Sequence, residues 1–257
     1  MISLFVNTVC FWFFVGISLI KHENRIHFRN KSVGEYALDL SGMIFRGVMI
    51  PVFHFLIVHY LLESNFPSLQ GMFDPNPWLI AVVSVLSFDY IAYWQHRFLH
   101  SKGFWKIHAT HHMMEKLDVV VNSRISLIGH FSNIFLYLAP LVFFVLKDPT
   151  WFVIPQVMGS CLEIWRHSEV IMLGNGPLSR LLRKFLLTPM DHHWHHGRFS
   201  DKTNFGIHFP FWDKIHGTYH FTEKQPELYG VDLGLSPLGK FFFPLFAEKL
   251  SKQKRSV

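Results

Sequence analysis

Apolar residues are gathered in five long runs along the chain, and most of the charged residues lie between these runs. The runs cover residues 2–20, 43–62, 78–94, 125–146 and 151–165. A helix needs about 20 mostly apolar residues to cross a bilayer, and the first four runs approach or reach that length. The fifth has only fifteen residues and follows a break of four, which predicts a short, tilted or re-entrant helix. The pattern predicts an all-α, integral membrane helical bundle.

Lys and Arg are distributed unevenly over the segments that connect the runs. Residues 21–31 contain four of them, residues 63–77 contain none, and residues 96–124 are basic again. Short cytoplasmic loops are enriched in Lys and Arg, so we expect the first and third segments on the cytoplasmic side and the second on the opposite side. The hairpin of the last two runs then returns the chain to the cytoplasmic side. There, residues 178–187 form a predicted basic amphipathic helix suited to the membrane interface.

The composition agrees with a membrane protein. Hydrophobic residues make up 50% and charged residues 16% of the 257 residues, whereas a soluble domain has about 25% charged residues. A very hydrophobic soluble bundle would leave the alternation of charge between loops unexplained.

The two cysteines, Cys10 and Cys161, are too few for a disulfide framework or a thiolate metal site. No internal repeat or flexible linker divides the chain, so we treat it as one folded unit.

Histidine is unusually abundant, with 18 residues, as many as Asp and Glu together. Half of them lie at the expected cytoplasmic ends of membrane segments, in the motifs HRFLH, HATHH and HHWHH and in WRHSE. The spacings i, i+3 and i+4 place imidazoles on one face of a helix. His193, the second histidine of HHWHH, lies about 100° away from that face. The nine histidines of the pattern are His96, His100, His108, His111, His112, His167, His192, His195 and His196.

Nine neighbouring imidazoles predict metal binding. If they were protonated near neutral pH they would repel one another, whereas metal-bound imidazoles are neutral and share the charge of the ion. Zinc takes three or four protein ligands, so nine nitrogens are too many for one ion and favour a pair of metals with four or five imidazoles each. Imidazole suits zinc, copper, iron and nickel alike. The ligand type alone therefore leaves the element open.

On these motifs the chain resembles the fatty acid hydroxylase and sterol desaturase superfamily of integral membrane di-iron enzymes. The resemblance rests on HRFLH, HATHH, RHS and TPMDHHWHHG, in this order and spacing. It extends upstream to Asp89, Tyr90 and Tyr93, and downstream to NFG at residues 204–206 and to FWDKIHGT at residues 211–218. It covers roughly residues 78–218, and the first two apolar runs are generic by comparison.

The resemblance implies an oxidoreductase that uses two Fe ions, dioxygen and two electrons to hydroxylate or desaturate a C–H bond of a lipid. It also implies that the nine histidines bind the metals, in a cytoplasmic helical cap. Residues 78–220 then form the catalytic region, residues 1–77 the N-terminal membrane helices and residues 221–257 a C-terminal tail. Sterols, fatty acyl chains and related lipids all occur as substrates in this superfamily, and the histidine motifs do not discriminate among them.

Two polar residues outside the histidine set are predicted to support the site. Asp89 lies seven residues before His96 on the same predicted helix, and a carboxylate at membrane depth is costly unless it has a partner. We interpret it as orienting a metal-bound imidazole through its second ring nitrogen, with a merely interfacial carboxylate as the alternative. Asn204 is predicted to orient ligands or to line the site. Asp191 either orients His192 or caps a helix, and the sequence does not separate these two roles.

The electrons must come from a separate donor, because the sequence has no haem-binding HPGG motif, no cysteine cluster and no nucleotide-binding glycine loop. A b-type cytochrome, or a ferredoxin with its reductase, is the partner class that the resemblance implies. We expect no nucleic-acid partner. A histidine-rich protein for metal transport or storage is the alternative from another class. A zinc hydrolase is disfavoured because no HExxH helix is present.

Overall fold

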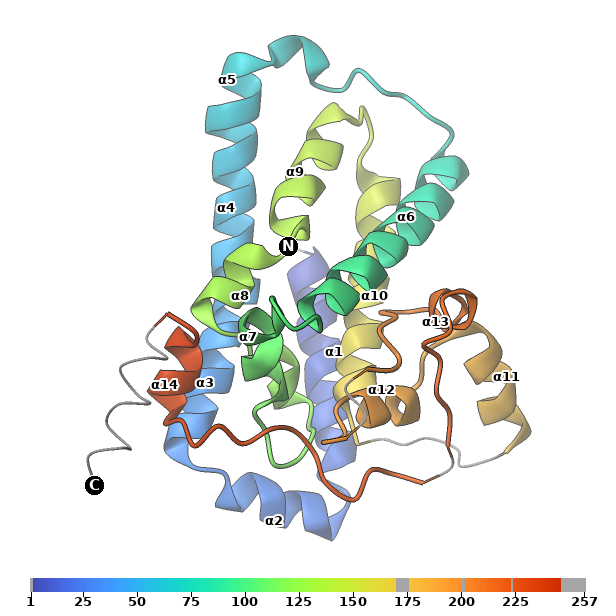
Figure 1. Ribbon diagram of the computed structural model, residues 1–257. Helices are drawn as coiled ribbons and strands as arrows, with labels where there is room; N and C mark the ends of the chain where they lie inside the picture. Colours follow the sequence, from blue (N-terminus) through green and yellow to red (C-terminus); the bar gives the residue numbers. More distant parts are fainter. Residues whose placement is uncertain (1, 170–175, 200–201, 223, 246–257) are drawn as a thin grey trace.

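The computed structural model describes residues 2–169, 176–199, 202–222 and 224–245 (Figure 1). Over these residues the chain is helical, with two isolated β-bridges and no β-strand. The predicted all-α class is therefore confirmed. Long helices extend toward one end of the molecule, and short helices gather at the other end, where α2 (His22–Asn30), α12 (Pro189–His195) and α14 (Pro237–Phe242) lie.

One continuous helix covers Val33–Asn65. It consists of α3 (Val33–Ile44), a π-helical stretch Phe45–Met49, α4 (Ile50–Leu56), a second π-helical stretch Ile57–Leu62 and α5 (Glu63–Asn65). The first π-helical stretch ends two residues before Pro51, which has no N–H to donate to the carbonyl of Gly47 and so disturbs the α-helical ladder there. The apolar run predicted the second half of this helix, but its first ten residues were missed because they carry Glu35 and Asp39.

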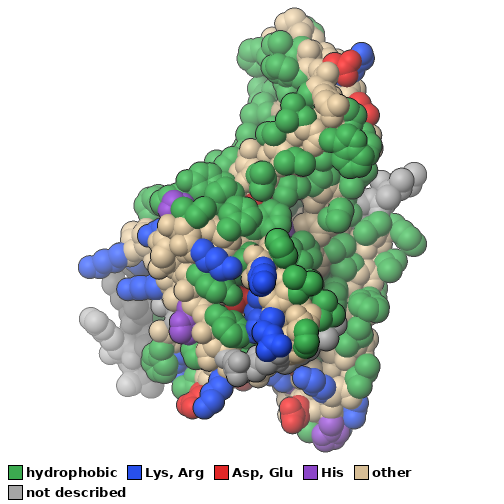
Figure 2. All heavy atoms as spheres, turned by 90° about the vertical axis from the view of Figure 1, so that its right-hand side faces the viewer, with side chains coloured by type: hydrophobic (Ala, Val, Ile, Leu, Met, Phe, Trp, Pro, Cys, Tyr) green, Lys and Arg blue, Asp and Glu red, His purple; other side chains and the backbone are tan. Residues whose placement is uncertain are grey.

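Among the described residues, three helical segments are each long and apolar enough to cross a membrane: Val33–Asn65, Pro77–Leu99 and Leu127–Val145. Only 11%, 17% and 22% of their most apolar windows are buried inside the protein, so their hydrophobic side chains face outward. Figure 2 shows this hydrophobic surface over the upper part of the molecule, with Lys and Arg gathered below it. An outward-facing apolar surface of this kind needs a membrane around it, and three of the predicted membrane runs are thereby confirmed as candidate spans.

The two remaining apolar runs differ from simple spans. Helix α1 (Ile2–Ser18) qualifies only together with α2, from which it is bent by 111°. Helix α10 (Thr150–His167) is not among the candidate spans in the described chain, which fits the short helix expected from its fifteen apolar residues. It packs instead between α1 and α6 (Pro77–Leu99). The fourth run forms α8 (Leu127–Ser132) and α9 (Phe135–Val145), with a break at Asn133.

Helix α6 holds a row of buried polar residues that runs from the membrane part to the cap. The Asn76 side chain accepts hydrogen bonds from the first backbone N–H groups and so caps its N-terminus. Asp89, Tyr93 and His96 are buried along it, and their spacing of four and three residues places them on one face. The helix ends at Leu99, so its last turn delivers this polar face to the cap.

The cap is built from short helices. They are α7 (Trp105–His108), the 3₁₀ helices Ala109–His112 and Val120–Ser123, α11 (Pro177–Phe185), α12, α13 (Phe211–Ile215) and α14. Helix α11 confirms the predicted amphipathic helix. Leu178, Leu181 and Phe185 are exposed on one of its faces, so this helix presents an uncovered apolar stripe beside its basic residues.

Candidate metal centre

All nine histidines of the sequence pattern are brought together in two neighbouring groups. The five-histidine group contains His96, His100, His108, His112 and His195, and the four-histidine group contains His111, His167, His192 and His196. Within each group the candidate ligand nitrogens lie within 4.8 Å of one another. The side chains are buried or half-buried, and both groups consist of imidazoles alone. The division into five and four matches the prediction of two sites.

The two groups are interleaved along the chain. In HATHH, His108 and His112 enter the five-histidine group, whereas His111 enters the other. The cluster on α12 does the reverse, because His192 and His196 belong to the four-histidine group and His195 to the other. Within each cluster, the two histidines that are four residues apart belong to the same group. The histidine three residues after the first one belongs to the other group. The one-face expectation was therefore too simple, since each cluster lies between the two groups and contributes to both.

Four of the nine imidazoles have their tautomer fixed by a backbone carbonyl. The acceptors are Phe205 O for His96 at 2.9 Å, Arg124 O for His111 at 3.1 Å, Glu163 O for His167 at 2.9 Å and Thr203 O for His195 at 2.8 Å. A carbonyl oxygen can only accept, so each Nδ1 must carry the proton and each Nε2 is left with a lone pair. This is the arrangement in which proteins orient metal-binding histidines.

The Nε2 atoms face one another at short distances. His111 and His167 approach to 3.4 Å, and His167 and His192 to 3.1 Å. Because Nε2 of both His111 and His167 carries a lone pair, no hydrogen bond can join this pair. In the other group, Nε2 of His112 and of His195 is buried without a hydrogen-bond partner among the described residues. Buried unsatisfied nitrogens are costly, and a cation in each group would satisfy them, so the residues fit a pair of metal ions.

Burial also keeps these imidazoles neutral. It lowers the pKa of His111 to about 4, and it lowers the pKa values of His108, His112, His192, His195 and His196 well below their usual range, with the neighbouring histidines adding to the effect. Desolvation disfavours the charged form of a buried imidazole. Metal ions bind the neutral form of the imidazole, so the lowered pKa values favour metal binding by both groups.

Asp89 has a different partner from the one predicted. Its Oδ1 accepts hydrogen bonds from the backbone N–H and the Nδ1 of His208, both at 2.8 Å. Within the described chain its Oδ2 is buried without a partner. The contact is thus to a tenth histidine and not to one of the nine. The His208 ring also lies against Gly159, where a Cβ atom would come within 2.7 Å of its Nε2. The catalytic role of Asp89 stays a prediction.

Asn204 and Asp191 hold the start of α12 in place. Asn204 adopts φ 55°, and its Nδ2 donates to the carbonyls of Asp191 and His220 at 2.9 and 2.8 Å. Asp191 forms a capping box with Thr188, accepting from its N–H at 2.8 Å. The structure therefore shows the capping alternative for Asp191. Both residues position the helix that carries His192 and His195, and the predicted role of Asn204 in the chemistry stays a prediction.

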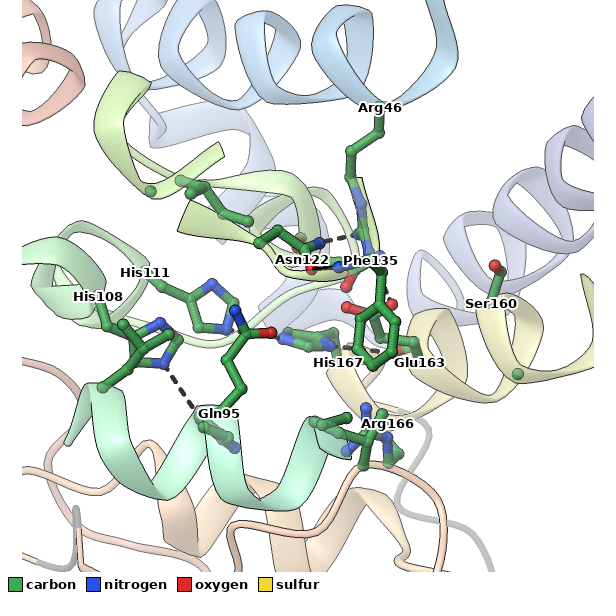
Figure 3. Close-up of a pocket in the computed structure, with 18 of the residues that line it drawn as sticks. Arg46, Gln95, His108, His111, Asn122, Phe135, Ser160, Glu163, Arg166 and His167 are labelled. Atoms are coloured by element: carbon green, nitrogen blue, oxygen red, sulfur yellow. Dashed lines mark hydrogen bonds and ion pairs between the residues drawn. The ribbon is translucent and has the colours of Figure 1, made fainter. Parts of the chain in front are cut away.

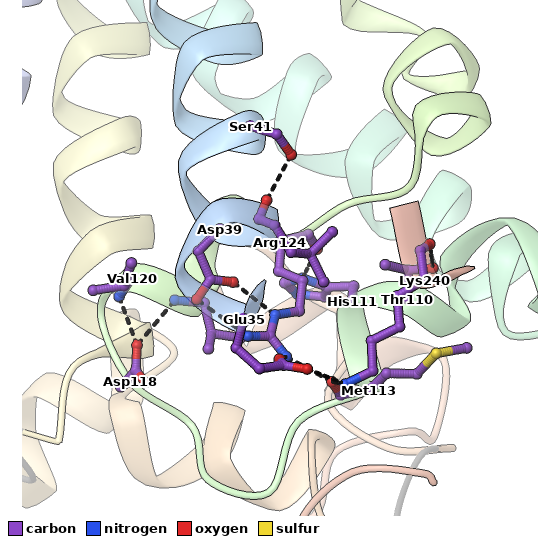
Figure 4. Close-up of polar contacts among 12 residues, drawn as sticks. Glu35, Asp39, Ser41, Thr110, His111, Met113, Asp118, Val120, Arg124 and Lys240 are labelled. Carbon is purple, nitrogen blue, oxygen red and sulfur yellow. Dashed lines mark hydrogen bonds and ion pairs between the residues drawn. The ribbon is translucent and has the colours of Figure 1, made fainter. Parts of the chain in front are cut away.

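The sequence reasoning missed two polar supports of the histidines. Asp213 accepts hydrogen bonds from the N–H groups of Phe205 and Gly206, both at 2.8 Å, and so holds the carbonyl that accepts from His96. Arg124, whose carbonyl accepts from His111, forms buried ion pairs with Asp39 and Glu35 at 2.7 and 2.6 Å (Figure 4). No local motif marks the Arg124 pairs, because Asp39 and Glu35 lie far from Arg124 in the sequence.

A cavity of about 330 Å³ opens beside both groups (Figure 3). His96 and His108 of the five-histidine group and His111, His167 and His192 of the four-histidine group line it, together with apolar side chains such as Phe88 and Phe135. The two candidate metal sites thus border one cavity with both polar and apolar walls.

The model of the fatty acid hydroxylase family matches residues 81–218, more than half of the chain. The chain belongs to the fatty acid hydroxylase family. All nine histidines, Asp89, Asn204 and Asp213 lie within the matched residues. Membership confirms the predicted superfamily, and the predicted class of enzyme, an oxidoreductase, agrees with it.

Two curated relatives are 27% and 28% identical to this chain over the aligned residues. It is 28% identical to the ornithine lipid hydroxylase OlsE of Rhizobium tropici over 195 residues, which are 73% of this chain and 56% of that protein. It is 27% identical to the lathosterol oxidase of Mus musculus over 235 residues, 88% of this chain and 74% of that protein. The chain thus spans little more than half of the first relative's length. No solved structure matches it.

Proposed function

We propose that the chain is a membrane-bound di-iron oxidoreductase that hydroxylates or desaturates a lipid C–H bond with dioxygen and two electrons. The observation that carries the proposal is the pair of imidazole groups, whose fixed Nδ1–H tautomers turn bare Nε2 atoms toward one another. Family membership and the two kinds of lipid-oxidising relative support it. When bound, two irons would supply the redox centre at which dioxygen is reduced.

The chain's own residues would perform three tasks around that centre. The carbonyls of Phe205, Arg124, Glu163 and Thr203 hold the ligand rings in one orientation. Burial excludes water, which would otherwise quench a reactive oxidant. The apolar part of the adjoining cavity admits the hydrocarbon. The nine imidazoles would hold the ions without adding negative charge to the site.

Several finer features belong to the same proposal. The chain crosses the membrane several times, with the histidine groups on the cytoplasmic side, in agreement with the basic residues near the cap and their absence from residues 63–77. The electrons come from a b-type cytochrome, or from a ferredoxin with its reductase. The substrate is a membrane lipid that reaches the site from the bilayer.

Metal analysis of the purified protein in nanodiscs tests the assignment. We expect close to two irons per chain, and loss of both iron and lipid oxidation in His111→Ala and His195→Ala, which remove one ligand from each group. His22→Ala removes an exposed imidazole and serves as the matched control that keeps both. Full iron loading and oxidation in the two ligand variants would contradict the proposal.

The placement of the histidines argues against metal transport or storage. A transport path needs ligands along several spans, but among the described residues His96, near the end of Pro77–Leu99, is the one histidine of the two groups within a candidate span, and His54, His59 and His130 lie outside both groups. Oxygen consumption coupled to lipid oxidation, without flux of iron across sealed vesicles, is the expected result.

Lipid profiles of cells with and without the protein would then identify the substrate as a lipid that gains an oxygen atom or loses two hydrogen atoms.

A further inference from the structure

A second cavity, of about 440 Å³, meets the one beside the histidines. Gln156 and Ser160, one turn apart on α10, line both cavities. The inner cavity is the one that contains the histidines. The outer cavity lies between α1, α4, α9 and α10. Because two side chains belong to both walls, the cavities adjoin at this turn of α10.

The outer cavity is suited to a hydrocarbon chain. Its walls include Phe55, Val58, Pro140, Phe143 and Val157, and the first four come from the candidate spans Val33–Asn65 and Leu127–Val145. It therefore lies at the level of the apolar surface that faces the membrane. Its polar lining includes His54, whose Nε2 is buried without a hydrogen-bond partner among the described residues.

The lining of the inner cavity includes a polar wall, formed by Arg46, Asn122 and Glu163. Arg46 and Glu163 form an ion pair at 2.7 Å with 32% and 26% of their side-chain surface exposed, and Arg46 also donates to the carbonyl of Asn122 at 3.4 Å. Figure 3 shows these three residues beside His111 and His167. Arg46 lies within an apolar candidate span, where a charge is costly and marks a functional position.

The polar wall is joined directly to the four-histidine group. The carbonyl of Glu163 accepts the Nδ1–H of His167 at 2.9 Å, so the side chain that pairs with Arg46 belongs to the residue that orients a candidate ligand. A polar group bound by Arg46 would therefore lie next to the metal centre. A guanidinium that is only partly covered retains donors for such a group.

We propose that the two cavities form one lipid channel with a fixed direction. The hydrocarbon lies in the outer cavity and passes Gln156 and Ser160, and a hydrogen-bonding group of the lipid, a hydroxyl or a carbonyl, binds the wall of Arg46, Asn122 and Glu163. This inference rests on the proposed function and specifies which lipids suit it. The oxidised carbon then lies near the polar end of the lipid and far from its terminal methyl group.

Photo-cross-linking in nanodiscs tests the direction without relying on activity. Two palmityl alcohol probes carry a diazirine, one at the methyl end and one beside the hydroxyl. We expect the methyl-end probe to label Phe55 and Phe143, and the hydroxyl-end probe to label Ile125 and Phe135, which line the inner cavity. Reversed labelling, with the hydroxyl near His54, would overturn the proposal, as would labelling of the outer surface alone.

A substitution at the junction of the two cavities tests whether they form one channel. Ser160→Trp fills the junction and should abolish labelling of the inner cavity, whereas Met158→Trp, at a position 64% exposed on the same helix, should leave it unchanged.

A double substitution tests the polar wall. Arg46→Met with Glu163→Leu removes both charges together, which avoids leaving one of them unpaired. It should reduce inner labelling by the hydroxyl-end probe about tenfold, the effect of losing one hydrogen bond to a charged group.

Iron content separates this inference from the proposed function. Ser160→Trp should retain the iron of the unmodified protein, because Ser160 lies outside both histidine groups. Wild-type labelling in Ser160→Trp and in the double variant would overturn the channel while leaving the di-iron assignment intact. An iron-free unmodified protein that labels as expected would instead contradict the proposed function alone.

Discussion

The guanidinium of Arg124 donates to Asp39 through Nε at 2.7 Å, and both side chains are almost completely buried. Asp39 lies on α3, at the start of a candidate membrane span, whereas the carbonyl of Arg124 accepts the Nδ1–H of His111. This pair therefore joins the long helix to the four-histidine group. Lys31 reinforces it by approaching Asp39 to 2.6 Å.

Replacing Asp39 with Asn should weaken both folding and metal binding. Removing one partner of a buried ion pair costs about 3–5 kcal/mol, and disturbing a group that orients a metal ligand lowers metal affinity about 10–100-fold. Thermal unfolding followed by tryptophan fluorescence and titration with iron measure the two effects. Asp74→Asn breaks the exposed pair with Lys147 and should change neither. A normal iron affinity in the Asp39 variant would show that the pair does not support His111.

The metal-free protein should lose stability as the pH falls from about 6.5, the usual pKa of histidine. Burial lowers the pKa of His111 and of His193 to about 4. Between these pH values the unfolded chain binds protons that the folded chain excludes, so the free energy of unfolding decreases as the pH is lowered. Chemical denaturation of the iron-free protein across this range measures the slope. A flat profile between pH 6.5 and 4 would contradict the burial of neutral imidazoles.

Helix α11 should lie in the membrane interface with its apolar stripe toward the lipid. Phe185 is 63% exposed on that stripe, and Lys184 precedes it on another face of the helix. Spin labels at the two positions form a matched pair. We expect a label at position 185 to collide more with oxygen, which dissolves in lipid, and one at 184 to collide more with a water-soluble nickel complex. Equal accessibility would show that α11 does not contact the membrane.

The two ends of the candidate spans should react on opposite sides of the membrane. Ser68 lies in the 3₁₀ helix Pro67–Leu69 beyond α5, and Ser101 follows the end of α6 next to the histidine groups, and both are exposed. Each is replaced by Cys in a background that lacks Cys10 and Cys161. An impermeant thiol reagent added to intact cells should label position 68 and spare position 101. The opposite result would invert the proposed orientation.

Local spacing was sufficient to single out eight of the nine histidines that the structure gathers, because their i, i+3 and i+4 motifs are visible in the chain, and the ninth, His167, directly follows an apolar run. It could not predict how they are divided. That depends on the change from α-helix to 3₁₀ helix at Ala109 and on the docking of α12 against α10, which are tertiary properties.

Pairings between distant residues were beyond the sequence for the same reason. Asp89 contacts His208, which is 119 residues away, and Arg124 contacts Asp39, which is 85 residues away. In both cases the sequence indicated where the charged residue lies in the chain's helices and loops, but it did not identify the distant residue that it contacts. The charges of Glu35 and Asp39 also concealed the first turns of the helix Val33–Asn65. They face the buried network of the cap, so their charge does not mark a loop.

The interleaved histidines make the two sites depend on the same two segments of the chain. Because HATHH and the α12 cluster each supply both groups, neither of these two segments can be deleted or exchanged without removing ligands from both sites. A shift of either cluster by one residue would misplace ligands in both at once. Insertions are thus expected in the loops outside these two clusters, where they leave the spacing of the shared ligands unchanged.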